Sequence, residues 1–129
     1  MRTLDNATDE LNTLLFAAQK RLQNLALGVE AVVELTSERH LIFGKVGSEW
    51  ILSVRYAKGE EAPLLKGSRE TRILAAAALG TLLKALQRNH AEMTREVDDA
   101  IRMARDFVYP VAEYEEAAHT KGAAGAKEK

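Results

Sequence analysis

The run from His40 to Tyr56 constrains the fold more than any other part of the sequence, because apolar and polar residues alternate along it on both sides of Gly47-Ser48. Alternation with a period of two is typical of β-strands, and a Gly-Ser pair suits the two-residue turn of a hairpin. We therefore expect strands over residues 41–46 and 49–56, joined by this turn.

A third strand is expected before this hairpin, because the period of two already begins at Val29 and continues to Thr36. The turn places Phe43 opposite Leu52, and pairing Leu35 with residue 41 would extend the same apolar face onto the third strand. Together the strands predict a three-stranded antiparallel meander with its core on one face.

Helical spacing flanks the strands on both sides. Apolar residues from Leu4 to Leu25 recur every three or four positions, which predicts a helix of about 20 residues ending near Gly28. Ser68 is a suitable N-cap for a second helical region, with Glu70 in its first turn. The fold class is therefore α+β.

The C-terminal helical region carries a heptad-like stripe from Ala76 to Val111, with apolar residues in steps of three and four. It could be one helix of about 40 residues, or two helices broken near Asn89, which has the spacing of a capping box with Glu92. The break is favoured because a single helix of about 60 Å would extend beyond so small a sheet.

The length of 129 residues is that of one ordinary domain. We expect a single α+β domain over residues 1–118: an N-terminal helix, the meander, and one long or two shorter C-terminal helices. Residues 119–129 are rich in glycine, alanine and lysine and are expected to form a flexible tail.

Composition excludes several classes of function. With 18 basic and 19 acidic residues the net charge is −1, so neither nucleic acid nor an anionic membrane surface is an expected partner. The chain has no cysteine, which excludes disulfides and thiolate metal sites, and no metal or cofactor motif is evident. It also lacks an apolar run long enough to span a membrane, and a cytoplasmic location is expected.

The reverse face of the predicted sheet also carries apolar residues, which is unusual for a meander that leaves one face in water. These residues surround Gly44 and are framed by charge, so we expect a covering helix or a partner over them. The heptad-like stripe is a second surface of this kind. The candidate interface residues on the two surfaces are Val32, Ile42, Val46, Ile51, Leu83, Leu86, His90, Met93 and Val97.

A second copy of the chain is the expected partner, because two-fold homodimers are the commonest means of burying such surplus apolar surface. Intramolecular cover by a helix that folds back is the competing interpretation. Another protein, or a small ligand held between sheet and helices, is a further possible partner.

Basic residues at the start of the second helical region are the best candidate for a ligand site. Lys66, Ser68, Arg69 and Arg72 surround a helix N-terminus, where free N–H groups could hold a phosphate. The segment lacks the second glycine of a P-loop. An ordinary N-cap with solvated or ion-paired arginines is the simpler interpretation.

The segments FGKVGSEWILSVRY and PLLKGSRETRILAAAALGTLLKAL, within residues 43–86, resemble uncharacterised small α+β proteins carried on mobile genetic elements. The resemblance covers about a third of the chain and implies neither an activity nor functional residues.

The sequence favours a non-catalytic interaction or regulatory module that acts as a homo-oligomer, because no serine, histidine or carboxylate has the setting of a catalytic residue. The alternative function is a small phosphometabolite-binding protein or enzyme that uses the basic helix N-terminus at residues 66–72.

Overall fold

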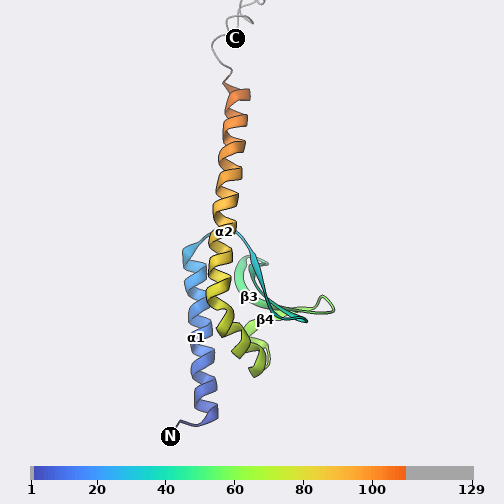
Figure 1. The fold of residues 1–129 in the computed structure, drawn as a ribbon. Helices are drawn as coiled ribbons and strands as arrows, with labels where there is room; N and C mark the ends of the chain where they lie inside the picture. Colours follow the sequence, from blue (N-terminus) through green and yellow to red (C-terminus); the bar gives the residue numbers. More distant parts are fainter. Residues whose placement is uncertain (1, 110–129) are drawn as a thin grey trace, which may run out of the picture. The chain divides into compact units, whose positions relative to one another are not determined.

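The computed structural model describes residues 2–109 and confirms the α+β class, with two long helices and one antiparallel sheet (Figure 1). The described chain divides after Glu92 into two units, residues 2–92 and residues 93–109. The predicted end of the domain at residue 118 and the predicted tail lie outside the described residues. The elements are α1 (Leu4–Leu25), β1 (Ala31–Thr36), β2 (Arg39–Val46), β3 (Glu49–Tyr56), β4 (Glu61–Pro63), a 3-10 turn η1 (Leu64–Lys66) and α2 (Arg69–Val108).

The ends of α1 follow from local capping. The Thr3 hydroxyl accepts a hydrogen bond from the backbone N–H of Asn6 at 3.1 Å, which satisfies one of the free donors of the first turn. At the other end Ala26 adopts a left-handed conformation with φ 48°, and Gly28 follows with φ 72°. The helix therefore ends close to the predicted position.

The sheet has the order β1-β2-β3-β4 with antiparallel neighbours throughout. Pairing of β2 with β3 is as predicted, with Phe43 opposite Leu52. The predicted pairing of Leu35 with Leu41 is wrong, because Val33 lies opposite Leu41. The register shifts where Thr36 pairs with residue 39, leaving a tighter turn than expected. Since the error is two residues, the same side chains still face the core.

Strand β4 was not predicted from the sequence. Ala62 pairs with Val54, and a turn through Gly59 at φ 91° brings the chain back alongside β3. Three residues are too few to show alternation, and a proline is usually evidence against a strand. Pro63 is tolerated here because β4 is the outermost strand.

Beyond β4, the open edge of β3 is completed by two glutamines of α1. Gln19 Oε1 accepts a hydrogen bond from the backbone N–H of Leu52 at 2.8 Å, and Gln23 Nε2 donates to the backbone carbonyl of Trp50 at 2.6 Å. These side chains are one helical turn apart and meet backbone groups two residues apart on the strand. Two amide side chains of α1 thus face the sheet.

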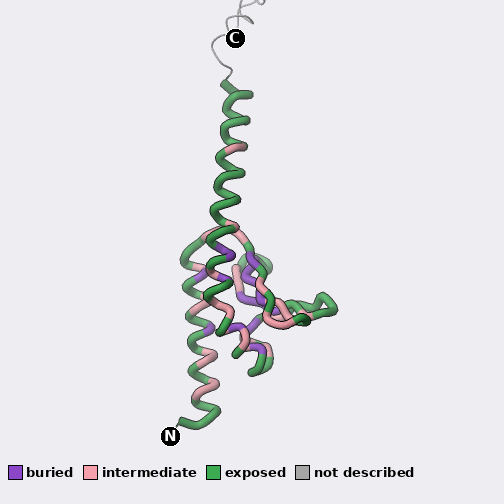
Figure 2. The backbone as a smooth tube through the Cα atoms, viewed as in Figure 1, coloured by how far each residue is buried: buried purple, intermediate pink, exposed green. Residues whose placement is uncertain are grey.

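The core lies between the sheet and the two helices and is formed entirely within residues 1–92 (Figure 2). Trp50 is half-buried against it and stacks on Phe43 with ring centroids 5.9 Å apart. Among the fully buried residues of this core, α1 contributes few, while the sheet and α2 contribute most. The buried apolar cluster is Leu15, Leu22, Ala31, Leu41, Phe43, Leu52, Val54, Leu64, Ala75, Leu82, Ala85 and Leu86.

Within residues 1–92, α1 and α2 lie side by side and run in the same direction (Figure 1). Near the start of both helices, the Arg72 guanidinium donates a hydrogen bond to the side-chain oxygen of Asn12. Further along, His90 Nδ1 lies 3.0 Å from the carbonyl oxygen of Leu27. The meander therefore connects two parallel helices.

The favoured break in the C-terminal helical region is absent, because α2 is one continuous helix of 40 residues. Asn89 does not cap a new helix. Its side chain donates instead to the carbonyl oxygen of Glu30 at 2.8 Å, next to the contact between His90 and Leu27. Both polar side chains thus bind the connection between α1 and β1, and the helix backbone continues through them.

Candidate functional site

The second half of α2 exposes an apolar face. Met93, Val97 and Ile101 are 45–48% exposed and Phe107 is 87% exposed. With 3.6 residues per turn, most of the exposed apolar residues fall within about 120° of the helix surface, and Met103, which is 65% exposed, lies outside this sector. We call this surface the 93–108 arc, and it consists of Met93, Val97, Ala100, Ile101, Ala104, Phe107 and Val108.

The opposite side of the same segment is charged, with three arginines and four carboxylates over residues 93–108. Arg102 Nη2 lies 3.1 Å from Asp99 Oδ1, an i,i+3 ion pair along this charged side. This second half of α2 is therefore amphipathic and close to neutral. Of the predicted interface residues, Met93 and Val97 lie on the arc.

Other predicted interface residues of α2 have different positions. Leu86 is 1% exposed and belongs to the core, so its assignment to an interface is wrong. His90 is exposed but its ring bonds to the α1–β1 connection. Leu83 is half-buried and lines a groove described below. The regular spacing of apolar residues along α2 does not show which of them face the sheet and which do not.

The reverse face of the sheet is less apolar than predicted. Val32 and Val46 are 43% and 53% exposed, and Ile51 is half-buried, but Ile42 is only 5% exposed and so cannot contribute a free surface. Glu30 also covers part of this face, since a Cβ at position 44 would lie 3.1 Å from its carboxyl carbon.

A row of polar and charged side chains crosses the reverse face on all four strands, formed by Glu34, His40, Arg55 and Glu61 in register. Arg55 Nε lies 3.1 Å from Glu61 Oε2. A hollow of about 240 Å³ beside this row includes Glu30 and Ser53 in its lining. Its lining contains two cations, Lys45 and Arg55, and two carboxylates, Glu30 and Glu61, so the hollow has no net positive charge for an anion.

The four predicted anion-binding residues do not converge on an open site. Ser68 is a helix cap, as predicted, and its hydroxyl accepts from the Thr71 N–H at 3.2 Å. Arg72 donates to Asn12 and to the Ser68 carbonyl. Lys66 and Arg69 are exposed. The carboxylate of Glu70, 3.5 Å from Arg39, adds negative charge at the same helix start.

We expect phosphate to leave the melting temperature unchanged when it is compared with chloride at equal ionic strength. The reason is that Ser68 and Arg72 already bind groups of the chain itself. Thermal unfolding followed by circular dichroism measures this. A rise specific to phosphate that disappears in an Arg69→Ala, Arg72→Ala variant would instead support the phosphate-binding function.

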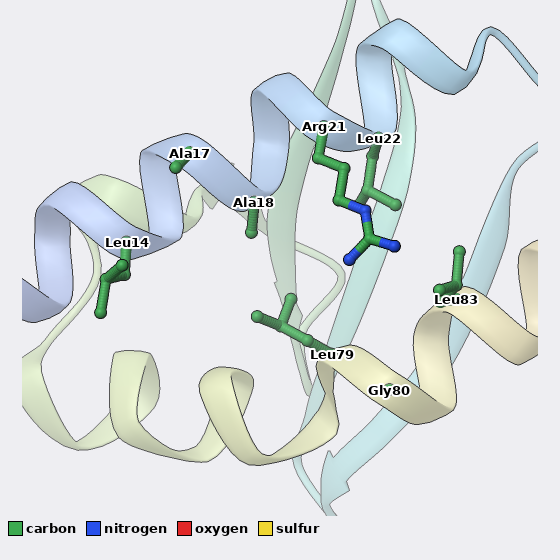
Figure 3. Close-up of a pocket in the computed structure, with 8 residues that line it drawn as sticks. All are labelled: Leu14, Ala17, Ala18, Arg21, Leu22, Leu79, Gly80 and Leu83. Carbon is green, nitrogen blue, oxygen red and sulfur yellow. The ribbon is translucent and has the colours of Figure 1, made fainter.

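An apolar groove of about 300 Å³ runs between α1 and α2, within residues 1–92 (Figure 3). Arg21 extends from α1 across it towards α2. The sequence contained a signal for this surface that the prediction did not use. Leu14 and Leu15 are adjacent, about 100° apart on the helix, and only one can face the core. The groove is lined by Leu14, Ala17, Ala18, Arg21, Leu22, Leu79, Gly80 and Leu83.

Across residues 2–109, no three histidine or acidic side chains gather closely enough to hold a metal ion. Over the same range no helix is both long and apolar enough to cross a membrane. The notable surfaces of the described chain are therefore the 93–108 arc and the groove between α1 and α2.

Comparison with known proteins adds no family to this description. No protein-family model, no curated protein and no solved structure matches this chain.

Proposed function

We propose that this protein is a non-catalytic interaction module that acts as a homo-oligomer, and that the 93–108 arc is buried against the arc of a second copy. The observation that carries the proposal is the exposure of this face, with Phe107 87% and Val97 48% exposed. An apolar face of this width on a helix is typical of a helix that packs against others.

The place of this segment in α2 supports the same conclusion. Residues 93–108 follow the core residues of the helix along the chain, and most helical stability in proteins comes from packing an amphipathic face. Association would stabilise residues 93–108 and remove the arc from water. The nearly balanced charge of this segment allows two copies to approach without strong repulsion.

The alternative, a phosphate-binding protein or enzyme, has weaker support. Of its four residues, Ser68 and Arg72 are occupied by contacts within the chain, and a carboxylate stands beside them. The mobile-element resemblance remains a prediction and contributes no activity to either function.

The decisive measurement is the mass of the protein in solution, by light scattering at micromolar concentration. One chain weighs 14.2 kDa, and we expect a mass of at least twice this value. Val97→Glu places a charge in the arc and should reduce the mass. Arg95→Glu adds the same side chain on the charged side and is the matched control, which should leave the mass unchanged.

Circular dichroism should show that both variants keep the folded residues 1–92. A wild-type mass of 14.2 kDa, or an equal effect of Val97→Glu and Arg95→Glu, would contradict the proposal.

A further inference from the structure

A single exposed stripe of α1 has a self-complementary order. Glu10, Leu14, Ala17 and Arg21 follow one another in steps of four, three and four, so they lie on one side of the helix. All four are exposed, and Leu14 is 57% exposed. The midpoint between Glu10 and Arg21 along the chain is also the midpoint between Leu14 and Ala17.

This order fits an antiparallel pair of identical helices. Two copies of α1 related by a two-fold axis at the common midpoint would place Glu10 against Arg21 of the second copy. The same axis would place Leu14 against Ala17 of the second copy. Each contact would occur twice, as an isologous interface requires.

The distribution of charge along the whole of α1 agrees with this direction. Its acidic residues, Asp5, Asp9 and Glu10, all lie in the first half, and its basic residues, Lys20 and Arg21, lie in the second half. A parallel pair of α1 helices would align like charges, whereas an antiparallel pair aligns opposite charges. Such complementarity selects orientation and excludes incorrect pairings.

The groove beside the stripe can receive a side chain from the second copy. Its lining includes Ala17, Ala18 and Gly80, whose small size leaves about 300 Å³ open between α1 and α2 (Figure 3). A Cβ built at Gly80 would meet nothing within 4 Å. Glycine inside a helix is destabilising relative to alanine, and nothing in the packing of this chain requires it here. The open space beside Gly80 is part of the groove and leaves room for an incoming leucine side chain.

The charged members of the stripe are available for such a contact. Within residues 2–109, Arg21 has no ion pair or hydrogen bond from its side chain, although it lies over an apolar groove. Glu10 has an ion pair with Arg2 at 2.7 Å, in which both side chains are more than half exposed. Replacing this exposed ion pair by one with Arg21 of a second copy therefore costs little free energy.

From these observations we infer that α1 pairs in antiparallel fashion with α1 of a second copy, with Leu14 of each chain in the groove of the other and Glu10 facing Arg21 across the interface. The inference rests on the proposed homo-oligomer and adds a second surface to it. Because the stripe and the 93–108 arc are different surfaces, using both would produce an assembly larger than a dimer.

A charge-exchange experiment in the Val97→Glu background tests the inference, because that substitution removes association through the arc. The Val97→Glu protein by itself should be a dimer. Adding Arg21→Glu should weaken its association by at least about tenfold, since two acidic residues then face each other twice. Adding Glu10→Arg as well should restore it. Sedimentation velocity over a concentration series measures the dissociation constants.

A steric variant gives a second, independent test. Gly80→Leu should leave the fold intact, because the groove is open, but should fill the place of the incoming Leu14 and weaken association. Gly80→Ala is the control and should retain it. Unchanged association in both Arg21→Glu and Gly80→Leu would overturn the inference.

The masses of the wild type and of the variants distinguish failure of the inference from failure of the proposed function. If only the arc associates, the wild type is a dimer and the Val97→Glu background is a monomer. If only α1 associates, the wild type is a dimer, Val97→Glu has no effect and Arg21→Glu produces the monomer.

Discussion

Replacement of Leu82 by alanine should lower the free energy of unfolding by about 3 kcal/mol. Leu82 is 0% exposed and lies on α2 in the cluster that joins both helices to the sheet. Removing its side chain loses transfer free energy and leaves a cavity, because the surrounding helices and strands can relax only in part. Urea denaturation followed by circular dichroism gives the change directly.

Leu4→Ala is the control, since it makes the same chemical change at a helical position that is 61% exposed. It should change the free energy of unfolding by less than about 0.5 kcal/mol. If the two variants lost equal stability, α2 would not lie on the sheet as described.

The double replacement Gln19→Ala, Gln23→Ala should also destabilise the protein, by about 2 to 4 kcal/mol. Each side chain binds a partly buried backbone group of β3, the N–H of Leu52 and the carbonyl of Trp50. Alanine would leave both groups without a partner, and desolvation of an unpaired polar group costs more than a hydrogen bond contributes.

The matched control is Gln87→Ala, the same change at an exposed position of α2. It should be nearly neutral in the same urea titration. Hydrogen exchange provides a local measurement, because the Leu52 amide should lose protection in Gln19→Ala alone. An unchanged exchange rate at this amide would show that Gln19 is not its partner.

The hairpin was predicted well because its register depends on local chemistry. The Gly47-Ser48 turn and the alternation on either side determine the pairing of β2 with β3 without any distant contact. The pairing of β1 was predicted two residues away from its observed register, because the irregularity near Thr36 depends on a turn with weak sequence signals. Strand β4 is too short to be recognised by periodicity.

The candidate surfaces were predicted in part. The stripe of α2 led to Met93 and Val97, which are exposed, but the same periodicity also selected Leu86, which is buried in the core. Periodicity shows which residues share a face and does not show what lies against it. The adjacent leucines Leu14 and Leu15 indicate that one of them lies off the core, but the groove itself depends on where α1 meets α2, about sixty residues later in the chain.

The parallel course of α1 and α2 within residues 1–92 has a consequence for the order of folding. The hydrogen bond of Arg72 with Asn12 joins the two helices across 60 positions, and that of His90 with Leu27 joins α2 to the α1–β1 connection across 63 positions. Two helices joined as a hairpin would instead meet through a short loop. Contacts between sequence neighbours form with little loss of chain entropy, and contacts across long loops need more. The meander should therefore form first and bring the helices together. Substitutions in its hairpin would then slow folding, while loss of the Arg72 or His90 contacts would mainly accelerate unfolding.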